Sequence, residues 1–331
     1  MKTGKLEPGG LERLVFTRTG ARRDEVVLGP RVGEDSAALD LEGELTVVTV
    51  DPITGASTGA GALAVQVTCN DLAATGAEPV AVLLTLLLPE TAGDALVEEI
   101  MESAHQAALE LGVALVGGHT EFTPGLALPV ICAAAVGRAP RRRLLPSGGA
   151  RAGDDLVLVG GAGVEGTAIL AHDFADVLGP YLGQPALAEA QAYSSRISIV
   201  RPALEAARLG ATAMHDVTEG GVFGAAYEMA SAAGTGLVVD AGRIPVSPVT
   251  RQIARLAGID PLQLISSGSL LVAAPDGEAM AKALACRGFA SAVIGRFQPG
   301  DVVLASGEPL AAPGTDALWQ ARLRLQGLRN S

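Results

Sequence analysis

The amino-acid sequence predicts a mixed α/β (α+β) protein made of two domains. At 331 residues the chain exceeds what one core usually serves, given about 150 residues per domain. Short apolar and β-branched runs alternate with amphipathic helical patterns, which is typical of helices packed on sheets. Hydrophobic residues make up 49% of the chain but aromatic ones only 3%, so Ala, Val and Leu must build the cores.

The first half of the chain carries a regular alternation of strand and helix signals. A helical pattern starts at Leu63, and the clearest helix follows Thr91, which forms a T-x-x-D capping box with Asp94. Gly112 is expected to end that helix. Its apolar stripe consists of Leu96, Ile100, Ala104, Ala107 and Leu111. Strands are expected at residues 45–50, 80–88, 113–116 and 129–136.

A basic stretch rich in Pro and Gly, residues 138–149, interrupts this alternation. We therefore expect an N-terminal domain at 1–150 and a C-terminal domain at 151–331. The second half repeats the mixed pattern, with helices expected at about 187–209 and 220–233. Its strands are expected at 155–159, 270–274 and 292–297 and directly before His215-Asp216.

Charge and cysteine content exclude several classes of protein. A net charge of -12 argues against a nucleic-acid surface, and a nucleotide would bind only if a metal offset the negative charge. The three cysteines are widely spaced, which indicates neither a disulfide framework nor a zinc site. The N-terminus lacks the apolar core of a signal peptide, and the run at 80–88 is too short to span a bilayer. We expect a cytoplasmic protein with no membrane or nucleic-acid partner.

Four short blocks combine acidic residues with glycine, alanine and small hydroxyl residues. Glycine lets backbone amides approach a ligand closely, and carboxylates gathered from distant segments indicate a divalent cation with a polyphosphate. The blocks are V-G-E-D-S-A at 32–37, N-D-L-A-A-T-G-A at 70–77, G-G-H-T-E at 117–121 and H-D-V-T-E-G-G at 215–221.

Three aspartates in the first half are candidate metal ligands. Asp71 falls inside an Ala-rich helical pattern, where aspartate competes with the backbone for hydrogen bonds, so metal coordination would explain its position. A solvated helix face is the alternative. Asp35 lies in a loop and Asp51 at the end of a strand, where ligands and ordinary turn caps are both common.

The G-G-H-T-E block directly follows the strand expected at 113–116. The amides of Gly117 and Gly118 would then form a phosphate-binding nest, with Thr120 or Glu121 reaching a metal. Alternatively, His119 only caps a turn.

The H-D-V-T-E-G-G block stands between a strand and a helix. A helix N-terminus at this place can receive an anion, which makes His215 and Asp216 candidates. Asp and Thr are also ordinary helix N-caps, so the block alone does not separate a site from a cap.

A G-x-G-x-x-G pattern at 161–166 follows a strand and precedes a helix, as a dinucleotide-binding loop does. The rest of that unit is missing, because the segment from Phe174 to Pro185 reads as a loop where a second strand should end in an acid. A dehydrogenase is therefore disfavoured.

Taken in order, these blocks and V-D-P at 50–52 resemble the aminoimidazole ribonucleotide synthetase (PurM-like) superfamily, nearest to its HypE-like hydrogenase expression/formation branch. The resemblance implies an N-terminal domain that dimerises through its sheet, a C-terminal α/β domain, and an ATP site with Mg²⁺ held by aspartates. Carried over by motif position, the metal ligands are Asp35, Asp51, Asp71 and Asp216, and Glu121 is added as a candidate metal ligand in place of the acid that His119 replaces. The cofactor-binding residues are Asn70, Asp71, Gly117, Gly118, Thr120 and Lys5, and the catalytic candidates are Asp71, Asp216, His215 and His119.

The resemblance implies a homodimeric enzyme that uses Mg²⁺ and ATP to activate a carbonyl, amide or phosphate oxygen by phosphoryl transfer. Its substrate is an unidentified small molecule or a protein-borne group. The alternatives are a non-catalytic nucleotide-binding paralogue and a small-molecule kinase similar to thiamine-monophosphate kinase. The chain departs from the HypE-like pattern by lacking the C-terminal cysteine, by Ser267-Gly268-Ser269 where Glu and Lys flank the glycine, and by His119 in place of an acid.

Overall fold

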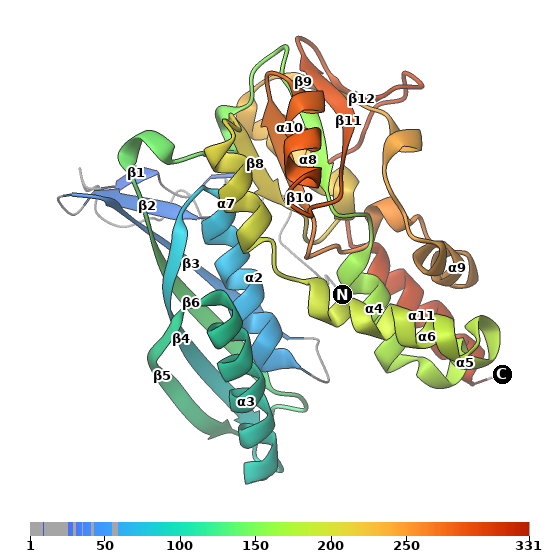
Figure 1. Cartoon of the computed structure of the whole chain (residues 1–331). Coiled ribbons are helices and arrows are strands. Elements are labelled where there is room, and N and C mark those ends of the chain that lie inside the picture. The colour runs from blue at the N-terminus through green and yellow to red at the C-terminus, as the bar shows by residue number, and fades with distance from the viewer. Residues whose placement is uncertain are drawn as a thin grey trace. The chain divides into compact units, whose positions relative to one another are not determined.

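The computed structural model describes residues 9, 26–28, 31–34, 36–40, 43–54 and 59–330, so the candidates Lys5 and Asp35 lie outside the described residues. The described chain forms two compact units. Among the described residues, 26–28, 36–40, 43–54 and 59–144 belong to the N-terminal unit, and 31–34 and 145–330 belong to the C-terminal unit. Each unit combines a mixed sheet with helices, as the sequence predicted (Figure 1).

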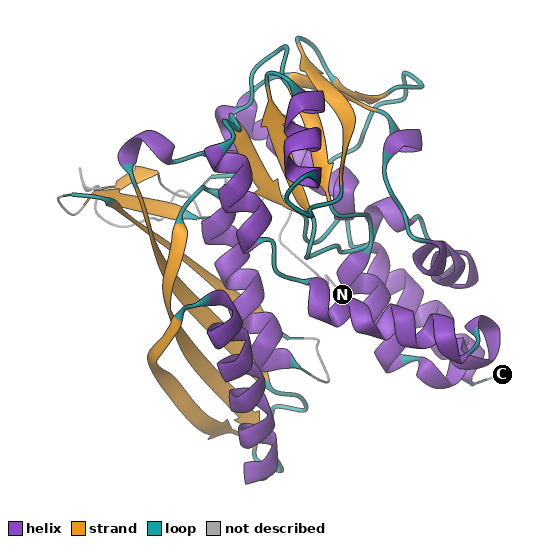
Figure 2. Ribbon diagram, in the orientation of Figure 1, coloured by secondary structure: helices purple, strands orange, loops and turns teal. Residues whose placement is uncertain are grey.

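The N-terminal unit is built on a sheet of order β1-β2-β3-β6-β4-β5 in its described residues. Its neighbouring strands are antiparallel, except that β4 and β5 are parallel and are connected through α3. Figure 2 shows α2 and α3 lying against this sheet. The bounds are β1 Val26–Leu28, β2 Ala37–Asp40, β3 Leu45–Ile53, α2 Ala60–Ala74, β4 Glu78–Pro89, α3 Asp94–Leu111, β5 Ala114–Thr123 and β6 Val130–Ala139.

Helix α3 ends as predicted but begins differently. Gly112 adopts a left-handed conformation at the C-terminus, and Ile100, Ala104 and Ala107 are buried on the expected stripe. The predicted capping box is wrong: the N-cap is Gly93 in an extended conformation, and no side chain caps the helix. Asp94 is therefore the first helical residue, where its charge still favours the positive end of the helix dipole.

Strand β5 is longer than its apolar run predicted. It continues through the whole G-G-H-T-E block, because parallel pairing with β4 extends from Ala81–Ala114 to Pro89–Thr123. Gly118, at a φ of 139°, permits this approach, since a Cβ there would lie 1.8 Å from the carbonyl oxygen of Leu84. The turn expected at this block is therefore wrong, whereas phosphate binding by Gly117 and Gly118 stays a prediction.

The C-terminal unit is built on a second sheet, of order β12-β9-β11-β7-β10-β8. Its pairs are antiparallel except for β9 with β12. The strands are β7 Asp155–Val159, β8 Ala213–Asp216, β9 Gly236–Val239, β10 Leu270–Ala274, β11 Ser291–Gln298 and β12 Val302–Leu304. Leu156 and Leu158 pack in one core with α8 (Gly221–Ala233), whereas Val157 points to the other face, towards α10 (Gly277–Ala285).

A second apolar cluster of this unit is mainly helical. It contains Phe174, Leu178 and Leu187 and is built from α4, α5, α6, α9 and α11. The helix bounds are α4 Val164–Asp173, α5 Ala175–Leu182, α6 Gln184–Gln191, α7 Val200–Arg208, α9 Pro248–Ala257 and α11 Ala317–Arg329.

Two sequence predictions fail in this helical region. The predicted loop at 174–185 is mostly α5, with Pro180 inside it, because burial of Phe174 and Leu178 outweighs the Gly and Pro signals. The single helix predicted at 187–209 is instead α6, a 3₁₀ turn at Ala192–Arg196 and α7.

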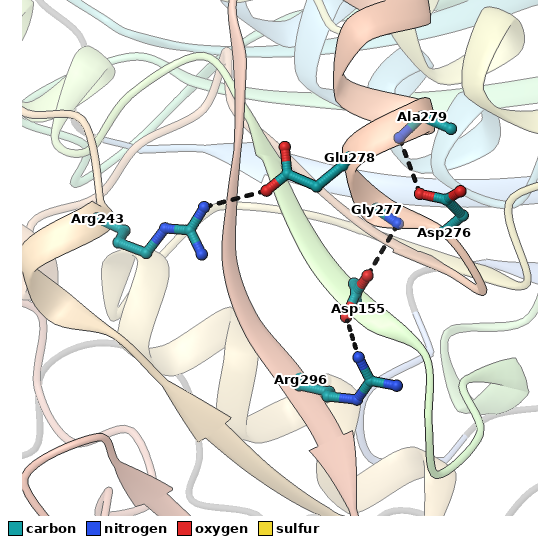
Figure 3. A network of polar contacts seen from close by, with 7 residues as sticks. All are labelled: Asp155, Arg243, Asp276, Gly277, Glu278, Ala279 and Arg296. Atoms are coloured by element: carbon teal, nitrogen blue, oxygen red, sulfur yellow. Dashed lines mark hydrogen bonds and ion pairs between the residues drawn. The ribbon is translucent and has the colours of Figure 1, made fainter.

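A polar network ties α10 to the beginning of β7 (Figure 3). Asp155 accepts a hydrogen bond from the amide of Gly277 at 3.0 Å and forms an ion pair with Arg296 of β11 at 3.0 Å. Asp276 caps α10 by accepting from the amide of Ala279 at 2.9 Å. Glu278 pairs with Arg243 at 3.2 Å. These contacts stabilise the end of the sheet where β7 begins, which is opposite to the end where β7 leads into α4.

None of the described helices is long and apolar enough to cross a bilayer. The three cysteines are free thiols, and only Cys69 is fully buried, which raises the pKa of its thiol to about 12. A cytoplasmic location stays a prediction.

Candidate functional site

Asp71 lies in the last turn of α2 and is buried, so the solvated-face alternative is wrong. Its Oδ2 atom accepts a hydrogen bond from the Thr49 hydroxyl of β3 at 2.7 Å. Asn70, directly before it, is fully buried. The helix therefore presents a carboxylate and an amide inside the N-terminal unit, where the sequence placed a ligand-binding pair.

Asp51 lies two residues after Thr49 within β3, two residues before the strand ends at Ile53. Alternation along a strand places Asp51 and Thr49 on one face of the sheet, the face that α2 covers. The structure thus brings Asp51 and Asp71 to the same face, as a shared ligand requires.

The His119 and Glu121 side chains lie on one face of β5, together with Thr123. His119 Nε2 lies 3.1 Å from Glu121 Oε2, and the Thr123 hydroxyl donates to Oε1 at 3.0 Å. The contact with His119, and after it that with Thr123, holds the pKa of the Glu121 carboxyl below its usual range. His119, Thr120 and Glu121 are exposed, so neither Glu121 nor Thr120 sits in the buried setting of Asp71.

His215 and Asp216 end β8 in the C-terminal unit and are almost fully buried. His215 Nδ1 donates to the Asp216 carbonyl oxygen at 2.8 Å, and Nε2 lies 3.6 Å from Glu228 Oε2 of α8. Asp216 Oδ2 is buried and has no hydrogen-bond partner among the described residues. A buried carboxylate oxygen without a donor suits a cation as its ligand.

Glu34 belongs to the V-G-E-D-S-A block but is not among the candidate residues, and its carboxyl is influenced by His215. Burial raises the pKa of its carboxyl, while Arg31, the amides of Ser147 and Gly148, and His215 oppose that rise. The Ser147 amide donates to Oε2 at 3.3 Å. Its place beside Asp35 in the V-G-E-D-S-A block was the one signal that could have selected it.

The G-x-G-x-x-G segment has the predicted strand–loop–helix context, but its glycines serve packing. A Cβ on Gly166 would lie 2.4 Å from the Leu264 side chain. The following residues form α4, α5 and α6, not the second strand that a dinucleotide-binding unit needs. The dehydrogenase alternative therefore loses its structural basis.

The part of the chain that the structure describes contains no group of three or more His, Cys, Asp or Glu side chains arranged to hold a metal ion. The individual ligand assignments, including Asp35 outside the described residues, stay predictions.

Two family models cover most of the chain. The AIR synthase related protein N-terminal domain matches residues 33–139, and the corresponding C-terminal domain matches residues 151–308. The chain belongs to the AIR synthase related family. This result confirms the superfamily that the motif blocks predicted.

Relatives of this AIR synthase related protein include the carbamoyl dehydratase HypE of Rhodobacter capsulatus, 30% identical over 301 residues, which span 89% of this chain and 82% of that protein. A solved structure of HypE in complex with ATP has a TM-score of 0.71 at 23% identity, covering 87% of this chain and 90% of the other. AaThiL complexed with AMPPCP and TMP has a TM-score of 0.76 at 20% identity, covering 96% and 99%. The two-domain PurM-like fold is thereby confirmed.

Proposed function

We propose that this AIR synthase related protein is a magnesium-dependent enzyme that uses ATP to activate a carbonyl, amide or phosphate oxygen by phosphoryl transfer. The observation that carries the proposal is the buried Asp71, oriented by the Thr49 hydroxyl at 2.7 Å on a sheet face shared with Asp51. Solved relatives of the same fold with bound ATP and AMPPCP support the choice of nucleotide.

The acidic residues fit a cation that carries a nucleotide. Asp51 and Asp71 in the N-terminal unit, and Asp216 in the C-terminal unit, each offer the kind of oxygen ligand that Mg²⁺ prefers, and the unpartnered Oδ2 of Asp216 suits a cation. Bound Mg²⁺ would neutralise the charge of the transferred phosphoryl group. Thr49 fixes the Asp71 carboxylate in one orientation, and we assign Asn70 to the nucleotide. Because catalysis of phosphoryl transfer rests on positioning and charge, no protein nucleophile is required.

Replacement of Asp71 tests the site. We expect Asp71→Asn to weaken the affinity for AMPPCP with Mg²⁺ about 100-fold in calorimetry, because it removes a charged ligand but keeps the shape of the side chain. The matched control is Asp94→Asn, an exposed aspartate of the same unit, which should bind like the wild type. Equal affinity in a folded Asp71→Asn protein would remove Asp71 from the site.

The reaction is tested by ADP release with uncharged amides, carbamoyl compounds and phosphorylated metabolites as acceptors. A kinase, the activity named for the thiamine monophosphate kinase neighbour, leaves the phosphoryl group on a stable product, whereas an ATP-driven dehydratase would also release inorganic phosphate. Binding of ATP without ADP formation on any acceptor would instead favour the non-catalytic paralogue.

We further propose that the N-terminal domain, predicted at residues 1–150, carries the nucleotide site and a dimer interface, with residues 151–331 as the second domain; the segments 31–34 and 145–150 pack with that second domain. Strands of the N-terminal sheet expose large apolar side chains, among them Val50, Val116 and Phe122. An exposed apolar sheet surface of this kind marks an interaction site. Light scattering should return twice the chain mass of 33.3 kDa, and a monomer at micromolar concentration would contradict the dimer.

A further inference from the structure

The turn at residues 217–220 leads from the end of β8 into α8 within the C-terminal unit. It directly follows Asp216, the aspartate whose Oδ2 atom is buried without a hydrogen-bond partner among the described residues. Asp216 is paired with Leu270, the first residue of β10, so the backbone before the turn is held by the sheet. What holds the turn itself therefore also fixes the place from which the Asp216 carboxylate projects.

The turn is held at both of its ends by other segments of the same unit. At its start, the Val217 amide donates to the Ser269 carbonyl oxygen at 2.9 Å. At its end, the Gly220 amide donates to Asp316 Oδ2 at 2.7 Å, across 96 residues of sequence. Gly220 is the N-cap residue of α8 and, at a φ of 86°, has no side chain with which to cap that helix. Asp316 supplies the missing acceptor.

The same carboxylate caps a second helix. Asp316 Oδ1 accepts from the Leu318 amide in the first turn of α11 at 2.7 Å, and only 5% of the residue is exposed. Packing reinforces the link, because a Cβ on Gly224 of α8 would lie 3.3 Å from the Pro313 side chain. Each oxygen of Asp316 thus serves one helix, and the starts of α8 and α11 are joined through one buried side chain.

Capping of α11 alone does not explain why residue 316 is an aspartate. Asp276, the N-cap of α10, does this work with one oxygen, which accepts from the Ala279 amide at 2.9 Å. Asparagine caps helices about as well as aspartate, since a single acceptor oxygen is enough. Two acceptor oxygens are a property of the carboxylate. The second oxygen of Asp316 is therefore needed for the turn and not for its own helix.

Glu165, in the first turn of α4, is a second buried acid in these surroundings, with 6% of the residue exposed. Its Oε2 atom has no hydrogen-bond partner among the described residues. Burial raises the pKa of its carboxyl to about 7; hydrogen bonding from Ser267 opposes the rise, and the negative charges of Asp316 and Glu219 add to it. A protonated Glu165 does not compete with the charge of Asp316.

Asp316 has the support for its charge that Glu165 lacks. Burial raises the pKa of the Asp316 carboxyl, but the backbone amides of Leu318, Gly220 and Ile265 oppose that rise. Hydrogen bonds to an ionised acceptor are shorter and stronger than those between neutral groups. Asp316 can therefore hold the turn firmly.

We propose that Asp316 is a positioning residue for Asp216: by tying turn 217–220 to the start of α11, it fixes the carboxylate that would bind the cation. The proposal rests on the proposed function, because it concerns the same Mg²⁺. Mg²⁺ demands near-ideal geometry from its oxygen ligands, so a loosened turn would weaken its binding. Through Asp316, α11 influences a site to which it contributes no candidate ligand.

The first test is Asp316→Asn, which keeps one acceptor for α11 and replaces the other oxygen by an amide group that cannot accept from Gly220. We expect the Mg²⁺ concentration for half-maximal AMPPCP binding in calorimetry to rise about tenfold, as loss of a group that orients a metal ligand predicts. The control is Asp276→Asn, the same change at the cap of α10, which should behave like the wild type. An unchanged Mg²⁺ requirement in a folded Asp316→Asn protein would overturn the proposal.

The second test is a double-mutant cycle, which a purely structural role of Asp316 would not move. Asp216→Asn should itself raise the Mg²⁺ requirement. If Asp316 acts through Asp216, then adding Asp316→Asn to Asp216→Asn should change that requirement less than about twofold, because the two effects are not additive. The same factor with and without Asp216 would show that Asp316 acts elsewhere.

A wild-type protein that binds no AMPPCP with Mg²⁺ would sink the proposed function, and Asp316 would then be judged with Mn²⁺ alone as the probe. Paramagnetic Mn²⁺ should broaden the amide NMR resonance of Val217 in the wild type, and clearly less in Asp316→Asn at the same concentration. Equal broadening in the two proteins, or none in the wild type, overturns the role assigned to Asp316 as well.

Discussion

Replacing Glu165 by glutamine should make the protein more stable, and increasingly so as the pH rises. The carboxyl has an ordinary pKa of 4.5 and a native pKa of about 7, because its burial disfavours the charged form. A native pKa above the unfolded one means that the stability present below pH 4.5 is lost as the pH rises through 7. Glutamine does not titrate and avoids this loss.

The pKa difference sets the size of the effect. At 1.36 kcal/mol for each pH unit, the interval from 4.5 to about 7 corresponds to about 3 kcal/mol of unfolding free energy at pH 9. At pH 5 the same relation leaves less than about 1 kcal/mol. All other titrating groups are the same in the wild type and Glu165→Gln, so they cancel in the difference between the two unfolding free energies. The change of that difference with pH therefore reports Glu165.

Urea denaturation between pH 5 and 9 measures this difference, with fluorescence of Trp319 as the probe. Trp319 is the only tryptophan of the chain and lies in α11 of the C-terminal unit, the unit that contains Glu165. Glu278→Gln, which changes an exposed glutamate, should show no such slope. A stability difference that stays constant with pH, or a Glu165→Gln protein that is less stable at pH 9, would refute a desolvated carboxyl.

Three further predictions follow from single contacts. Gly118→Ala should lower the unfolding free energy, measured by thermal unfolding, by at least about 3 kcal/mol, because the new Cβ would meet the Leu84 carbonyl oxygen. Gly117→Ala is the control and should cost clearly less, because the space around its Cβ is open; equal losses would contradict the close approach of β5 to β4. Asp276→Ala should lower the unfolding free energy by about 1 kcal/mol, because it removes the N-cap of α10. Thr91→Ala should change the unfolding free energy by less than about 0.5 kcal/mol, because no side chain caps α3; a larger effect would mean that Thr91 does cap that helix. Thr49→Val should weaken AMPPCP binding about tenfold in calorimetry by releasing the Asp71 carboxylate, and unchanged binding would separate Thr49 from the site.

Local signals predicted most elements but not their ends. The strands at 155–159 and 270–274 match because their apolar runs are bounded by a polar residue on one side and by glycine or proline on the other. β5 extends beyond Val116 because its last seven residues are held by pairing with β4, a long-range contact that no local pattern records. In the same way, α5 forms around Pro180 because Phe174 and Leu178 find a helical layer to pack against.

In the candidate site, too, the local sequence pattern identified some residues, whereas others depend on contacts with residues far away in the sequence. Asp71 was predicted because aspartate is unusual within an Ala-rich helix, and the structure explains it through Thr49, 22 residues earlier. Glu165 was overlooked because its surroundings come from Ser267, Glu219 and Asp316, which are far from it in the sequence. A glutamate in the first turn of a helix looks ordinary until its burial is known.

The segment Arg31–Glu34 packs in a different unit from the residues that flank it in the sequence, and this affects how the protein folds during translation. This short segment belongs to the C-terminal unit, and the Glu34 carboxylate accepts from an amide 113 residues later. A Cβ on Gly33 would lie 2.9 Å from the carbonyl oxygen of Glu228 in α8, so the backbone there lies directly against that helix. During translation the segment must therefore wait for most of the chain to emerge, and a fragment beginning at residue 145 would leave this part of α8 uncovered.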